Sequence, residues 1–182
     1  MSMFPIHTFA SAPAKSRPVL EALQQAFGVV PNLAAGMSNS PELIQGFIGL
    51  FQNVHSGTFD EAGIQVLLLT NAVTNGCAWA VAFHTMLALK EGVAGADVAA
   101  IRAGRLPAGP RHAALSRLAR TLIDGRGRVD DAEVDRFCGA GFAPAQALEV
   151  VGVVAASTIT NYAAGMIRPP LEDALQAHAW AA

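Results

Sequence analysis

One cysteine and one histidine share the short apolar stretch "NGCAWAVAFHT" near the middle of the chain. Cys77 directly follows Asn75-Gly76, and His84 lies seven residues further on. On an α-helix seven residues make almost two turns, so both side chains face the same way, roughly 10 Å apart along the axis. That separation excludes a direct Cys–His pair. The residue between them on this face is Ala80, which has no reactive group.

Thiol chemistry is the reaction that Cys77 and His84 suggest. A cysteine at the start of a helix lies beside free backbone N–H groups, which stabilise a thiolate and lower the thiol pKa. Two structural roles compete with that prediction. A free cysteine is most often a small buried hydrophobic residue, and a histidine on an apolar face is more often hydrogen-bonded in the core than catalytic. The residues alone leave both alternatives open.

Helices are predicted around this stretch and through nearly the whole chain. Asn75-Gly76 interrupts a long apolar segment, which is expected to be central because it is apolar on several faces. Ser40, Asp60 and Asp130 are predicted to cap the helices that follow them. The predicted helices cover residues 17–27, 41–54, 61–74, 77–91, 97–103, 111–123, 131–139 and 144–164. "GVVPNLA" is predicted to be a turn or an extended link, because Pro31 disfavours helix at Val30.

Length and composition bound the class of protein. The 182 residues suit a single domain over 1–182, all-α with about seven or eight helices and an irregular arm over about 1–16. The formal net charge of −2 predicts neither a nucleic-acid nor a membrane partner. Because the chain is 52% hydrophobic and only 14% charged, a homo-oligomer with apolar interfaces is expected.

The cellular setting predicted from the sequence is cytoplasmic. The only cysteines are Cys77 and Cys138, which is too few for a disulfide scaffold. The most apolar run, Val150 to Ala156, is shorter than the roughly 20 residues of a spanning helix. The N-terminus has no basic segment ahead of an apolar one, so no signal peptide is expected.

The segment "NGCAWAVAFHTMLALKEG" resembles the core of the AhpD-like alkylhydroperoxidase and carboxymuconolactone decarboxylase family. "FGVVPNLAAGMSNSPELIQGF" and the chain from "VAAIRAGRLPAG" to "STITNY" are similar to the flanking parts of its peroxidase-related subgroup, so the resemblance covers about residues 25–165. It implies an AhpD-like helical fold. In the redox branch of the family, a C-x-x-C-x-x-x-H motif starts a helix, and a glutamate stands twelve residues before the first cysteine.

This chain keeps half of that redox motif. Cys77 matches the first cysteine and His84 the histidine, whereas Ala80 replaces the second cysteine and Gln65 replaces the glutamate. The family's dithiol cycle needs a thiolate, a resolving thiol within disulfide reach and a proton-accepting group. An amide does not titrate, so Gln65 cannot act as the base. The resemblance gives Cys77, His84 and Gln65 as the candidate catalytic residues, with no cofactor and no metal.

Three functions follow from this partial match. The first is thiol-dependent reduction of a peroxide by Cys77 alone, with resolution by an external thiol reductant, by Cys138 or by a neighbouring subunit. The second is a non-catalytic family member that binds a small apolar ligand or a protein partner. The third is acid–base chemistry by His84, as in the decarboxylase branch of the family. Trp79 and Phe83 are expected to pack in the core or an interface, or to wall a small apolar pocket.

The remaining polar residues suggest no further site. The other histidines, His7, His55, His112 and His178, lack the spacing of a metal site. "CGAGFAP" follows no strand and lacks the lysine of a phosphate loop, so it is predicted to be a turn between helices.

Overall fold

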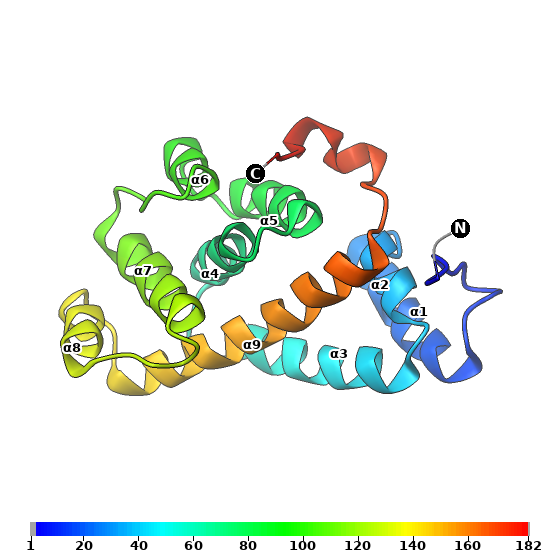
Figure 1. Ribbon diagram of the computed structural model, residues 1–182, viewed down its shortest axis with the longest axis horizontal. Helices are drawn as coiled ribbons and strands as arrows, with labels where there is room; N and C mark the ends of the chain where they lie inside the picture. Colours follow the sequence, from blue (N-terminus) through cyan, green and yellow to red (C-terminus); the bar gives the residue numbers. More distant parts are fainter. Residues whose placement is uncertain (1–2, 182) are drawn as a thin grey trace.

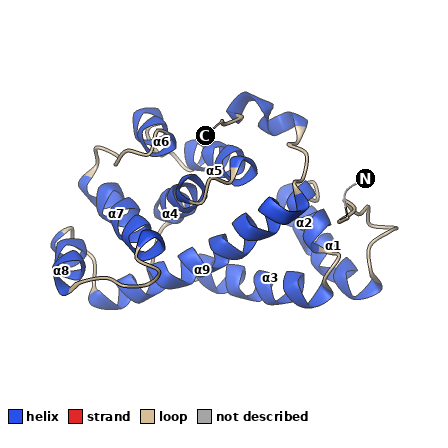
Figure 2. Cartoon of the chain, in the orientation of Figure 1, coloured by secondary structure: helices blue, strands red, loops and turns tan. Residues whose placement is uncertain are grey.

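A computed structural model describes residues 3–181 as a bundle of α-helices, with no strand within that range (Figures 1 and 2). The helices are α1 (Arg17–Phe27), α2 (Asn32–Met37), α3 (Pro41–His55), α4 (Glu61–Thr74), α5 (Ala78–Lys90), α6 (Gly95–Arg102), α7 (Pro110–Asp124), α8 (Asp131–Gly139) and α9 (Pro144–Ile167), with 3-10 turns η1 (Ala14–Ser16) and η2 (Asp173–His178). All eight predicted helices are present, with ends that differ by a few residues. The all-α prediction is confirmed. Residues 1–2 of the predicted arm lie outside the described range.

The predicted helix starts are made by side-chain caps. Oγ of Ser40 accepts a hydrogen bond from the Leu43 N–H at 3.2 Å, and Oδ1 of Asp60 accepts from the Gly63 N–H at 2.8 Å. Oδ1 of Asp130 accepts from the N–H of Glu133, also at 2.8 Å. Each bond satisfies a backbone donor that the first turn of a helix leaves free.

Helix α2 corrects the prediction for "GVVPNLA". The chain is extended at Pro31 (ψ 137°), as predicted, but it turns into a helix at the next residue. A proline restricts the residue before it and not those after it, so it suits the position before a helix. Leu33 and Met37 are buried on this short helix, and their burial compensates for its length.

Two helices organise the bundle. Helix α4 is central: every residue from Gly63 to Ala72 is buried, under α5, α6, α7 and α9. Helix α9 runs across the molecule and packs against α2, α3, α4 and α7, while the chain after it arches back so that η2 covers α5 (Figure 1). Segments from both ends of the sequence therefore meet around α4 and α5.

Helix α9 is 24 residues long and contains the apolar run Val150 to Ala156. By length and composition alone it could cross a membrane, but 44% of its most apolar 18-residue window is buried inside the molecule. The core helix of a soluble protein passes the same test.

Helices α2 and α9 approach closely at a glycine, and this contact can be tested. A Cβ atom on Gly36 would lie 2.6 Å from Cγ2 of Ile167, whereas one on Gly49 would meet nothing within 4 Å. Gly36→Ala should therefore lower the free energy of unfolding by about 1–3 kcal/mol through overpacking. Gly49→Ala should raise it by about 0.5–1 kcal/mol through helix propensity. Urea denaturation of both variants checks the pair, and equal effects would contradict the close packing.

Candidate functional site

The Asn75-Gly76 break between α4 and α5 is a Schellman turn. The N–H of Cys77 donates to the carbonyl of Ala72 at 2.9 Å, and the N–H of Gly76 donates to that of Val73 at 3.1 Å. This pattern needs a residue with positive φ, and Gly76 supplies it at φ 65°. The turn makes Cys77 the N-cap residue of α5.

Cys77 is a buried thiol at the start of α5, with 8% of its surface exposed. Burial raises the pKa of this thiol above its ordinary value, although the backbone N–H groups of Ala80 and Trp79 act to lower it. The helix N-terminus has the effect expected from the sequence, but burial outweighs it because the charged thiolate loses hydration. Cys77 is therefore held mainly as the protonated thiol.

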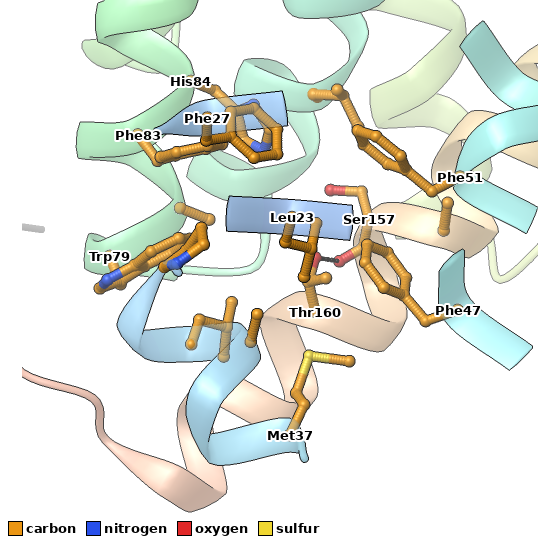
Figure 3. Close-up of a pocket in the computed structure, with 16 residues that line it drawn as sticks. Leu23, Phe27, Met37, Phe47, Phe51, Trp79, Phe83, His84, Ser157 and Thr160 are labelled. Atoms are coloured by element: carbon orange, nitrogen blue, oxygen red, sulfur yellow. Dashed lines mark hydrogen bonds between the residues drawn. The ribbon is translucent and has the colours of Figure 1, made fainter. Parts of the chain in front are cut away.

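An apolar cavity of about 70 Å³ lies beside α5 and is enclosed by parts of α1, α2, α3, α4, α5 and α9. Trp79 and Phe83 of α5 stack at a ring distance of 5.0 Å. Their rings face Phe47 and Phe51 of α3 across the cavity (Figure 3). Trp79 and Phe83 pack against neighbouring side chains, as expected first, and they also line a small apolar pocket, which was the alternative.

The cavity wall contains Ala80 and His84 but not Cys77. Ala80 stands where the redox branch carries its second cysteine, so the missing sulfur is missing from the cavity wall itself. The retained sulfur lies outside the wall. Among the described residues that line the cavity, His84, Ser157 and Thr160 carry the polar side chains, and none is a lysine or an arginine.

His84 is joined to Gln65, as the resemblance implied. Nδ1 of His84 lies 3.0 Å from Oε1 of Gln65, and both side chains are buried. Burial, with a smaller contribution from the charge of His55, lowers the pKa of His84 to about 3. The imidazole is therefore neutral at physiological pH. A carboxylate at position 65 would oppose this shift, whereas the amide of Gln65 brings no charge.

A second histidine, His55, lies close enough for its charge to act on His84. Nδ1 of His55, at the end of α3, lies 2.9 Å from Oε1 of Glu61 in the first turn of α4. Nε2 of His55 is enclosed and has no partner within residues 3–181. Sequence spacing indicated no role for His55 at this site, because it precedes His84 by 29 residues and only the fold brings its charge near that ring.

The segment after α9 fastens two walls of the cavity through one carboxylate. Oε2 of Glu172 accepts from the indole N–H of Trp79 at 2.9 Å, and Oε1 accepts from the backbone N–H of Asn32, at the start of α2, at 2.6 Å. Arg102 of α6 holds the end of this segment, donating to the carbonyls of His178 and Ala179. No sequence pattern pointed to Glu172, which lies 93 residues from Trp79.

The cysteines do not form a pair in this structure. Cys77 and Cys138 are both free, and Cys138 lies on α8, which packs on α7 and α9 at one end of the molecule, away from α5 (Figure 1). No cluster of three or more potential metal ligands occurs within the described part of the chain. The structure thus joins Gln65 and His84 at the cavity and leaves Cys138 elsewhere.

Comparisons with known proteins agree with this architecture. Residues 41–121, which include α4 and α5, match the Carboxymuconolactone decarboxylase family. The fold is similar to that of the alkylhydroperoxidase AhpD core, an uncharacterized peroxidase-related protein from Ralstonia eutropha JMP134, with a TM-score of 0.84 and 17% identity over 96% of this chain and 94% of that one. No curated protein matches the sequence.

Two further solved structures have the same fold. The debrominase Bmp8, in a variant complexed with 2,3,4-tribromopyrrole, has a TM-score of 0.78 and 16% identity over 98% of this chain and 96% of that one. A peroxidase-related protein from Silicibacter sp. TM1040 has a TM-score of 0.75 and 14% identity over 95% and 92% of the two chains. The fold is AhpD-like, and the part of the chain that contains the helix pair α4 and α5 matches the carboxymuconolactone decarboxylase family.

The buried neutral imidazole predicts a pH-dependent stability. The pKa of His84 is lowered from 6.5 to about 3, so below pH 6.5 the unfolded chain takes up a proton that the folded chain refuses. The stabilisation is present above pH 6.5 and is lost as the pH falls towards 3, by at most about 1.4 kcal/mol per pH unit. Urea denaturation between pH 4 and pH 7.5 should show a flatter dependence for His84→Gln.

The charge of His55, which lies beside Glu61, acts on the pKa of His84, so His55 needs its own control. In His55→Gln, the free energy of unfolding should still fall steeply below pH 6.5, because His84 is unchanged in this variant. If His84→Gln and the unsubstituted protein lose stability in parallel, the neutral buried imidazole is ruled out.

Proposed function

We propose that the protein binds a small, mainly apolar molecule in the cavity beside α5 and does not run the dithiol cycle of its redox relatives. The composition of the cavity wall is the observation that supports this proposal. The wall is built from aromatic and aliphatic side chains, with Ala80 at the position where a reacting sulfur would stand. Apolar pockets with a few convergent polar groups are the usual form of a small-molecule site.

The chemistry of the pair Gln65 and His84 also supports binding over turnover. A dithiol cycle needs a base to remove a thiol proton and a second sulfur to resolve the first. Gln65 supplies no base, and the neutral His84 has no thiol beside it in the cavity wall. The debrominase fold relative was solved with a small halogenated ring, which is a precedent for such a ligand on this scaffold.

Peroxide reduction by Cys77 alone is the second candidate function. The backbone N–H groups of Trp79 and Ala80 act on its sulfur and favour the thiolate. In this reaction the thiolate attacks a peroxide oxygen, the O–O bond breaks, an alcohol leaves and a sulfenic acid remains. One external thiol then forms a mixed disulfide and releases water, and a second thiol restores Cys77 and leaves as a disulfide.

The decarboxylase chemistry of the family receives less support from the cavity. A lactone acid carries negative charge, and no lysine or arginine stands among the described residues of the wall. A neutral His84 offers an anion no compensating charge.

A homo-oligomer remains part of the proposal. Leu148, Val151, Tyr162 and Met166 are exposed along α9, and each is 45–75% accessible to solvent. Their spacing aligns them along one side of the helix. An apolar stripe of this kind supports self-association, as the composition of the chain predicts.

Filling the cavity tests the binding function. Ala80 is 1% exposed and lines the cavity, whereas Ala78, two residues earlier, is exposed and does not. Toluene is a suitable probe, with binding followed by calorimetry and by NMR shifts of cavity methyl groups. Ala80→Leu should abolish binding, while Ala78→Leu should leave it within about twofold, since only the first occupies ligand space. Equal loss in both variants would refute binding in this cavity.

The single-thiol candidate has a separate test. Peroxide consumption with a dithiol reductant is measured for the unsubstituted chain, for Cys77→Ser and for the double variant Ala80→Cys with Gln65→Glu. We expect steady turnover only from the double variant, because it restores a sulfur to the cavity wall and a carboxylate behind His84. Turnover by the unsubstituted chain that Cys77→Ser abolishes would instead establish the single-thiol function.

A further inference from the structure

The cavity presents one fixed hydrogen-bond acceptor to a ligand. Oε1 of Gln65 accepts only, so Nδ1 of His84, 3.0 Å away, must carry the imidazole proton. In a neutral ring this leaves a lone pair on Nε2. Within residues 3–181, Nε2 of His84 has no hydrogen-bond partner, and unlike Nε2 of His55 it is not sealed from open space. His84 is one of the residues that line the cavity, which makes Nε2 the candidate acceptor for a ligand there.

Neither of the hydroxyl groups in the wall has a fixed role that would favour a hydrogen-bond donor or an acceptor on the ligand. The Thr160 hydroxyl donates to the carbonyl of Ser157 at 2.8 Å within α9 (Figure 3). Oγ of Ser157 accepts from Nδ2 of Asn161 at 3.4 Å, and its own hydrogen can turn either way. His84 is therefore the group whose role is fixed by its surroundings.

The walls set the shape and size of the ligand. The stacked rings of Trp79 and Phe83 and the rings of Phe47 and Phe51 line different sides of the cavity, so a ligand can make aromatic contacts on more than one side (Figure 3). The cavity volume of about 70 Å³ corresponds to about five or six water-sized positions. Aromatic walls favour offset or edge contacts with a second ring.

We propose that the cavity binds an uncharged aromatic ring of about five or six atoms that carries one O–H or N–H group, and that this group donates to Nε2 of His84. The inference rests on the proposed binding function and specifies its ligand. Gln65 acts as a positioning residue, because it determines which ring nitrogen carries the proton. The replacement of a carboxylate by an amide thus converts a proton-relay position into one that fixes a neutral acceptor.

Phenol and toluene test the proposal, since they share a ring and differ in the donor. The full chain should bind phenol at least as tightly as toluene. In His84→Phe, the affinity for phenol should fall by about tenfold or more beyond any change in the affinity for toluene, because the phenol hydroxyl would be buried without a partner. Affinities are measured by calorimetry, with circular dichroism to verify the fold of the variant.

A measurement on the unsubstituted protein keeps the test decisive if His84→Phe does not fold. With ¹⁵N-labelled histidine, Nε2 of His84 should resonate as the unprotonated ring nitrogen, and phenol should shift it whereas toluene should not. A protonated Nε2, or tighter binding of pyridine than of phenol, would overturn the proposal because the wall would then offer a donor. One outcome separates the two proposals: Ala80→Leu abolishes toluene binding, while His84→Phe weakens phenol binding no more than toluene binding. That result would refute the proposed ligand class and leave the binding function supported. Failure of both probes to bind overturns both.

Discussion

The hydrogen bond between His84 and Gln65 determines what the centre of this bundle can do. It lies between α4 and α5, the two helices that the Schellman turn at Gly76 sets side by side, and it is buried from solvent. Because Gln65 brings no negative charge that would stabilise a protonated ring, burial keeps the imidazole neutral. A neutral ring with a fixed proton is a weak acid–base catalyst at physiological pH but a well-defined hydrogen-bond partner. The surrounding apolar wall fits the second role, since it contains no group whose charge must be balanced.

Local sequence signals predicted most of the fold. The caps Ser40, Asp60 and Asp130 act within three residues, so their patterns are readable directly from the chain. The central place of α4 followed from its apolar residues on several faces, and the resemblance grouped Gln65 with His84 among the candidate site residues. Helix α2 was missed because the effect of Pro31 on Val30 was extended to the whole segment as a turn or link, and because burial by α9 stabilises a helix too short to stand alone.

The cavity could not be predicted to the same extent, because long-range packing creates it. Phe47 and Phe51 show only helical periodicity in the sequence, and nothing in their spacing indicates that they face Trp79. The position of Cys77 outside the wall depends on where one turn of α5 points. The net direction of its thiol pKa depends on burial, which opposes the helix N-terminus that the sequence did reveal. Hydration of a charge is a property of the folded surroundings, and a motif carries no information about it.

Glu172 connects two sides of the cavity wall that come from distant parts of the sequence. A ligand inside would be recognised by α4 and α5, yet the indole of Trp79 and the start of α2 are both fastened to a carboxylate that follows α9. Two sides of the enclosure therefore share one fastening and loosen together. A substitution that removes the Glu172 carboxylate would therefore release the indole of Trp79 and the start of α2 at the same time.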